Sequence, residues 1–114
     1  MTYFRSPVSF EFIETPVFCR QVDAALDHDE YRELQWALVA RPELGPVIRG
    51  TGGLRKMRWA PGGRGKSGGV RVIYYWAVSE QVIYLLLMYA KNEQGTLTAA
   101  QEKLLRALVQ QEFG

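Results

Sequence analysis

The chain has 114 residues, of which 47% are hydrophobic and 12% aromatic, and its formal net charge is +2. This length and composition predict one domain, residues 1–114, with a buried core, and they exclude a disordered chain. The single cysteine, Cys19, excludes an internal disulfide, and the single histidine, His28, excludes a His/Cys zinc cluster and a pair of catalytic histidines. We therefore expect no metal and no other cofactor.

The sequence also predicts where the protein acts. No charged-then-apolar leader opens the chain, so we expect a cytoplasmic protein. The longest apolar run, residues 82–90, is about half as long as a membrane-spanning helix needs to be. We therefore expect this run to be a buried strand and the protein to have no membrane partner.

Charge is distributed unevenly along the chain. Residues 44–79 contain seven basic side chains and no acidic one, whereas residues 1–43 contain four basic and eight acidic side chains. The modest net charge thus conceals a cationic middle segment. Such a segment favours binding to a polyanion, most commonly a nucleic acid.

The N-terminal part is predicted to form one strand and two helices. Apolar and polar residues alternate over residues 8–12, which is typical of a half-buried strand. Thr15 and Pro16 predict the start of a short helix, and the segment 27–30 predicts a capping box at the start of a second one. The dipeptide Arg41-Pro42 should end that helix, because a residue before proline is disfavoured in helical geometry.

The C-terminal part is predicted to form three antiparallel strands, at residues 54–60, 70–78 and 82–90, and a closing helix that begins at a capping box over residues 98–101. A glycine-rich loop, residues 61–69, joins the first two of these strands. The order is strand, two helices, three strands, helix. We expect an α+β domain whose helices cover one face of the sheet.

Four basic residues should converge on the other face of this sheet. Within residues 54–60, Met57 and Trp59 share one face and Lys56 and Arg58 the other. If the three strands form a meander, Arg71 and the end of the last strand lie beside them. Close like charges repel by about 1 kcal/mol per pair even in water, so their clustering favours a bound anion over an idle solvated surface.

These segments resemble a known family. The stretch from Gly53 to Arg58, the glycine-rich residues 63–69, the strand at 70–75 and the closing residues 89–92 are similar to the RelE/HigB toxins of bacterial type II toxin–antitoxin systems. The resemblance implies a toxin that enters the ribosome and cuts messenger RNA. An antitoxin protein, which we expect to contain a helix-turn-helix, would neutralise this toxin. It also implies that the family's basic site residues correspond to Lys56, Arg58, Arg71 and Lys91.

The chemistry of RNA suggests a role for each candidate. The 2′-OH of RNA can attack the adjacent phosphate, and guanidinium groups match phosphate geometry. We expect Arg58 and Arg71 to hold the scissile phosphate, and Lys56 or Lys91 to carry a proton. Tyr75 and Tyr89 either stack on a base or simply pack in the sheet. The remaining expected RNA contacts are Arg55, Arg64, Lys66 and Asn92.

Two other functions remain open from the sequence. A toxin of the related ParE type would share the fold and inhibit DNA gyrase without cutting RNA, although it would not need a cationic face on the middle strands. A non-catalytic nucleic-acid-binding domain would show salt-sensitive binding without any product.

Overall fold

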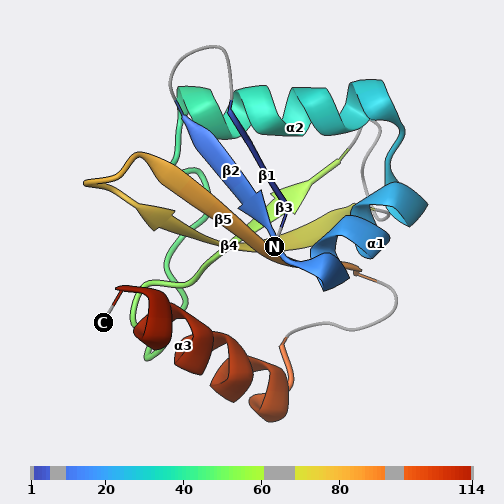
Figure 1. Ribbon diagram of the computed structural model, residues 1–114. Coiled ribbons are helices and arrows are strands. Elements are labelled where there is room, and N and C mark those ends of the chain that lie inside the picture. Colours follow the sequence, from blue (N-terminus) through green and yellow to red (C-terminus); the bar gives the residue numbers. More distant parts are fainter. Residues whose placement is uncertain (1, 6–9, 61–68, 92–96, 114) are drawn as a thin grey trace.

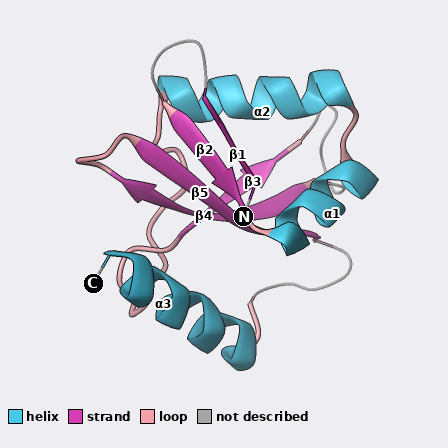
Figure 2. Cartoon of the chain, viewed as in Figure 1, coloured by secondary structure: helices cyan, strands magenta, loops and turns pink. Residues whose placement is uncertain are grey.

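The computed structural model describes residues 2–5, 10–60, 69–91 and 97–113. Within that part of the chain, five strands form one sheet in the order β1-β2-β5-β4-β3 (Figures 1 and 2). None of the helices described there is long and apolar enough to cross a membrane. The elements are β1 (Thr2–Arg5), β2 (Glu11–Glu14), α1 (Pro16–Ala25), α2 (His28–Ala40), β3 (Arg55–Trp59), β4 (Val70–Ala77), β5 (Val82–Ala90) and α3 (Ala99–Phe113).

The α+β class is confirmed, and so is the antiparallel meander of β3, β4 and β5. The strand expected over residues 8–12 ends later than predicted, because β2 spans Glu11–Glu14; residues 8 and 9 of that expectation lie outside the described residues. Its position is set by parallel pairing with β5, in which Glu11 lies opposite Val82 and Glu14 opposite Leu85. The additional strand β1 pairs antiparallel with β2 at the sheet edge, so the sheet is mixed.

Helices α1 and α2 begin where the capping patterns predict. The Thr15 hydroxyl accepts a hydrogen bond from the Phe18 N–H at 3.0 Å. Asp27 and Glu30 form a reciprocal capping box, each side chain accepting from the other residue's backbone N–H at 2.8 Å. These bonds satisfy N–H groups that have no partner within the helix. Both helices lie on one face of the sheet, over a core that includes Phe12, Phe18, Leu34, Leu38 and Tyr74.

Helix α3 lies on the opposite face of the sheet (Figure 1), so the expectation that all helices cover one face is wrong. The reason is that the central strands are apolar on both sides. Ile73 and Leu87 point toward α3, where they pack with Leu105 and Val109 in a second core cluster. This face of the sheet is therefore covered along part of its length, and only the remainder can serve as an open surface.

Strand β5 contains a β-bulge where the pairing with β4 shifts register. Ile73 lies opposite Leu87, but the next residue, Tyr74, lies opposite Leu85. The intervening Leu86 is the extra residue of the bulge, and both leucines 86 and 87 belong to the core on the α3 side. Side chains from α1 and its cap satisfy the irregular backbone, since Thr15 donates to the Leu86 carbonyl at 2.8 Å and Gln21 accepts from the Met88 N–H at 2.8 Å.

Candidate nucleic-acid interface

The strand register places Arg58, Arg71 and Tyr89 in one row across β3, β4 and β5. Arg58 is the direct partner of Arg71, and Arg71 is the direct partner of Tyr89. Directly opposite side chains of an antiparallel pair have Cβ atoms about 4.5–5.5 Å apart. Met57 belongs to the core on the α1 side, so its neighbours Lys56 and Arg58 face the α3 side with Arg71. The structure thus brings three of the four expected catalytic residues onto one face.

The fourth expected catalytic residue, Lys91, lies at the same end of the sheet. Its backbone N–H donates to the Gly69 carbonyl at 3.3 Å, which extends the β4–β5 ladder by one step. The Arg71 guanidinium also lies near Gly69, because a Cβ atom placed on this glycine would be 3.9 Å from Arg71 Nη1. The same Cβ would be only 3.0 Å from the Trp59 carbonyl oxygen, so the close approach of β3 to β4 favours glycine here.

The four cations, called the cationic row below, differ in exposure, and none has a carboxylate partner among the described residues. Arg71 is buried, with 9% of its surface exposed, whereas Arg58 and Lys91 are exposed and Lys56 is half-buried. None of the four forms an ion pair within the described ranges, where Arg41 and Glu43 make one at 4.0 Å beyond α2. A buried charge without a partner is costly, so this row suits an anion that supplies the missing charge.

Tyr89 is far more buried than a base-stacking residue should be. Only 5% of its surface is exposed, and its ring packs in the cluster on the α3 side. Its hydroxyl oxygen is buried and has no hydrogen-bond partner within the described part of the chain. Burial raises the pKa of the Tyr89 phenol, and the positive charge of Arg71 partly opposes that rise. The ring face is therefore not open to a base in this state.

Tyr75 lies away from the row of Arg58, Arg71 and Tyr89. It is four residues beyond Arg71 on β4, about 13 Å along the strand. Its half-buried ring packs against Gly53, where an added Cβ would be 2.8 Å from the ring. Gly53 also has a φ of +118°, which disfavours any larger residue. Tyr75 therefore packs against the turn that precedes β3.

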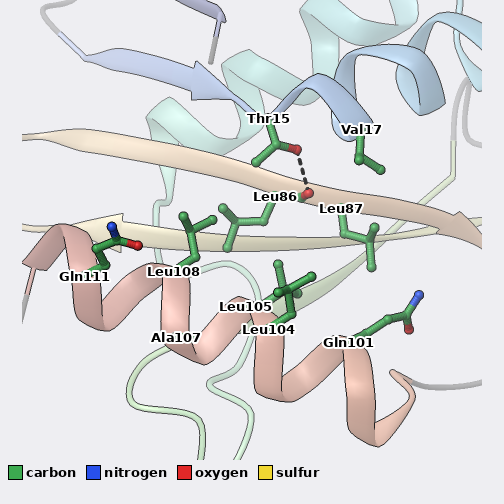
Figure 3. A pocket seen from close by; sticks show the side chains of 10 residues that line it. All are labelled: Thr15, Val17, Leu86, Leu87, Gln101, Leu104, Leu105, Ala107, Leu108 and Gln111. Carbon is green, nitrogen blue, oxygen red and sulfur yellow. Dashed lines mark hydrogen bonds between the residues drawn. The ribbon is translucent and has the colours of Figure 1, made fainter.

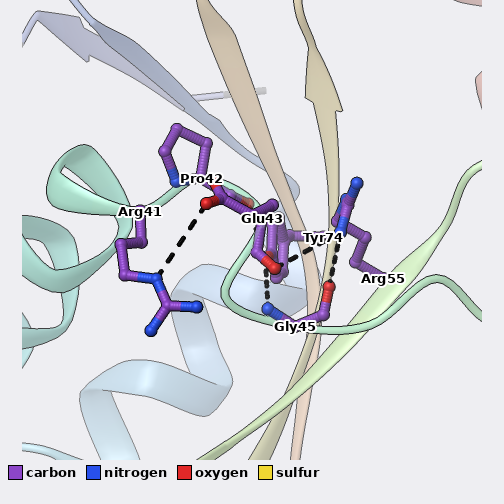
Figure 4. Close-up of polar contacts among 6 residues, drawn as sticks. All are labelled: Arg41, Pro42, Glu43, Gly45, Arg55 and Tyr74. Atoms are coloured by element: carbon purple, nitrogen blue, oxygen red, sulfur yellow. Dashed lines mark hydrogen bonds and ion pairs between the residues drawn. The ribbon is translucent and has the colours of Figure 1, made fainter.

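Arg55 points to the face of the sheet opposite to Arg58 and binds the loop after α2 (Figure 4). Its Nη1 atom donates to the Gly45 carbonyl at 2.8 Å and to the Glu43 carbonyl at 3.4 Å. Its guanidinium also lies 5.8 Å from the centre of the Trp76 ring. The same loop is fixed by Tyr74, whose hydroxyl donates to the Pro42 carbonyl at 2.7 Å. Arg55 thus makes structural contacts and is separated from the cationic row. Three further expected RNA contacts lie outside the described residues: Arg64, Lys66 and Asn92.

A buried polar cluster surrounds Glu14, and no local pattern of the sequence indicates it. This carboxylate has only 6% of its surface exposed and accepts hydrogen bonds from the Tyr31 hydroxyl and from Cys19 Sγ, the latter at 3.1 Å. Burial raises the pKa of Tyr31, and Glu14 raises it further. The cluster joins β2, α1 and α2, and only their packing reveals it. Across the described ranges, no group of three or more His, Cys, Asp or Glu side chains could hold a metal ion.

An apolar groove runs between α3, β5 and the start of α1 (Figure 3). Its volume is about 380 Å³, and its lining includes Val17, Leu86, Leu104 and Leu108. Leu104 is 71% exposed and forms one contiguous apolar lining with the other leucines of the groove. The groove therefore offers an apolar surface that no described segment covers.

Comparison with known proteins supports the fold at the level of architecture. No family model matches the sequence. The free state of the Escherichia coli toxin RelE, solved as a double arginine-to-alanine mutant, is similar with a TM-score of 0.54 over 96% of this chain and 98% of that chain. The two sequences are 17% identical. The chain therefore has a RelE-like fold, in agreement with the fold that the resemblance of its motifs implied.

Proposed function

We propose that this protein is the toxin of a type II toxin–antitoxin module and that it cleaves messenger RNA on the ribosome. The observation that supports this proposal most is the direct pairing of Arg58 with Arg71 on one sheet face, with Lys56 on the same face and Lys91 at the same strand ends. The solved structure of a toxin with the same fold also supports it. A gyrase inhibitor would have no need for this row of cations.

The proposed reaction uses the nucleophile that RNA itself carries. The 2′-oxygen attacks the adjacent phosphorus, the bond to the 5′-oxygen of the next nucleotide breaks, and a 2′,3′-cyclic phosphate remains. Arg58 and Arg71 bind the non-bridging oxygens and stabilise the charge that develops on them. Lys56 or Lys91, which lie on the same face or at the same strand ends as the two arginines, moves the protons of the entering and leaving oxygens.

The proposed protein partner is the cognate antitoxin. The apolar groove under α3, with the exposed Leu104 at its rim, suits an amphipathic segment of such a partner. Genetic evidence would be direct: the chain expressed alone should arrest growth, and co-expression of a small protein encoded by the neighbouring reading frame should relieve the arrest.

The decisive experiment combines purified ribosomes, a defined messenger RNA and the purified protein, with primer extension to map cleavage. We expect new 5′ ends in the presence of ribosomes, and we expect EDTA added after ribosome assembly, with ribosome integrity controlled, to leave cleavage of the bound message unchanged. A gyrase supercoiling assay runs in parallel. Inhibition of supercoiling without RNA cleavage would overturn the proposal, as would salt-sensitive RNA binding that never yields a product.

A further inference from the structure

We propose that the Tyr89 hydroxyl is a second donor to the phosphate that Arg71 binds, so that Tyr89 acts as a catalytic residue through its hydroxyl and not through its ring. This inference rests on the proposed endoribonuclease function and names one more group at the same site. Arg71 and Tyr89 are the two least exposed polar side chains of the interface. Arg71 is 9% exposed and Tyr89 is 5% exposed, and they are direct neighbours across β4 and β5.

Packing alone does not account for a tyrosine at this position. The ring belongs to the apolar core cluster that also contains Ile73, Leu87 and Leu105, where phenylalanine would be equally apolar. The hydroxyl is buried without a partner in the described residues, and unsatisfied groups of this kind are rare because each one opposes folding. A tyrosine therefore carries a cost in the free protein that phenylalanine would avoid. A ligand that accepts its hydrogen bond explains why the hydroxyl is there.

The chemistry of the pair fits a phosphate. Arg71 provides the positive charge, and the phenol provides a neutral donor beside it, so one non-bridging oxygen can accept from both. The phenol is protonated at neutral pH, and burial raises its pKa further above the ordinary value, which suits a donor and not a base. The Arg71 guanidinium lies close to Gly69 in the free protein. Since the hydroxyl is covered in this state, the proposed contact requires the side chains around it to rearrange when the phosphate binds.

The test is the substitution Tyr89→Phe, which removes one oxygen atom and keeps the ring. The matched control is Tyr84→Phe on the same strand, since Tyr84 lies opposite Tyr75 at the far end of the sheet from Arg71. We expect Tyr89→Phe to lower the rate of ribosome-dependent cleavage by about 100-fold, the effect of losing one donor to a developing oxyanion. Its Tm should stay equal to or above that of the wild-type protein, and Tyr84→Phe should cleave at the wild-type rate. Cleavage by Tyr89→Phe at the wild-type rate would overturn the inference, and so would a matching loss in Tyr84→Phe.

A second measurement separates this inference from the proposed function. Inorganic phosphate, used as the probe, should raise the Tm of the wild-type protein and of Tyr84→Phe more than that of Tyr89→Phe and Arg71→Gln. If the wild-type protein cleaves no RNA, the proposed function fails, and this difference in phosphate-induced stabilisation still decides whether Tyr89 and Arg71 form an anion site. Equal stabilisation of all four proteins would overturn the site itself.

Discussion

Arg58 and Arg71 face each other directly across β3 and β4, and the described part of the chain provides no carboxylate partner for either. Like charges directly opposite each other on a sheet are destabilising, by an amount comparable to the roughly 0.2–1 kcal/mol of a favourable pair. The unusual feature is the burial of Arg71, since its exposed neighbour Arg58 is solvated by water. This arrangement weakens the free protein slightly, and we propose that it favours the binding of an anion.

Replacement of Arg71 by glutamine should separate stability from activity. We expect cleavage to fall at least 100-fold, because a donor to the transition state is lost. The free energy of unfolding should stay within about 1 kcal/mol of wild type or rise, because a repulsive pair is removed. Chemical denaturation and the primer-extension assay measure the two effects. A folded Arg71→Gln protein with full cleavage would remove Arg71 from the site.

Arg58→Gln should change the salt dependence of RNA binding. An exposed arginine that neutralises one phosphate contributes about −0.7 to the slope of log K against log salt concentration for a single strand. We expect the slope to become shallower by about that amount, with binding weakened for all sequences alike. Fluorescence anisotropy of a 2′-deoxy oligonucleotide at several salt concentrations provides the measurement. Arg32→Gln on α2 is the control, and an equal change in both variants would contradict a specific role for Arg58.

Arg55→Ala should behave as a stability variant. The substitution removes the hydrogen bond to the Gly45 carbonyl and the contact with the Trp76 ring, which together stabilise the fold by roughly 1–3 kcal/mol. We expect a lower Tm, while cleavage per folded molecule is retained. Arg41→Ala, which breaks only a surface ion pair of 4.0 Å, should have little effect on Tm. Loss of cleavage at unchanged Tm in Arg55→Ala would instead indicate RNA contact.

Tyr31 should make the protein less stable in alkaline solution. Its pKa in the folded state is raised above the ordinary value of 10.0, so above about pH 10 the unfolded chain loses this proton while the folded chain keeps it. The unfolded state then binds fewer protons, and the free energy of unfolding falls by about 1.4 kcal/mol per pH unit for each such tyrosine. Tyr31→Phe should show a shallower decline above pH 10. At neutral pH it should cost about 1–3 kcal/mol, because Glu14 loses a donor. An unchanged alkaline slope would contradict this assignment.

Leu104→Glu should uncouple toxicity from neutralisation. The substitution places a charge at the rim of the apolar groove while leaving the cationic row untouched. Because Leu104 is 71% exposed, the fold should tolerate the change. We expect normal RNA cleavage and weakened rescue by the co-expressed antitoxin. The control is Lys103→Glu, an exposed neighbour outside the groove lining. Full rescue of the Leu104 variant would place the partner's binding surface elsewhere.

The local signals in the sequence predicted those features that depend on near neighbours. Alternation in residues 54–60 correctly placed Met57 in the core and Lys56 and Arg58 on the other face, because side chains of a strand point to alternate sides. The caps at Thr15 and Asp27 likewise involve residues within three positions of each other. Such contacts can be inferred without knowledge of the rest of the chain.

Features that depend on distant pairing could not be predicted in this way. Glu14 looks like a surface residue in the sequence, and it is buried because Tyr31 and Cys19 approach it from two helices. Arg55 belongs to a run of basic residues, yet its partners are carbonyl groups ten and twelve positions earlier in the chain. The position of α3 on the far face depends on the apolar side chains on both sides of β5. This pattern alone does not indicate which helix covers which side.

The bulge at Leu86 determines the chemistry of the end of β5. If Leu86 were part of a regular strand and not the extra residue of a bulge, strict alternation would continue from Leu85 through Leu86, and every later side chain of the strand would exchange faces. Tyr89 would then point toward α1, and Met88 would take its place beside Arg71. The bulge thus accommodates one additional leucine while Tyr89 stays opposite Arg71: deletion of Leu86 would keep that pairing, whereas a regular strand that retained Leu86 would separate the two residues of the proposed anion site.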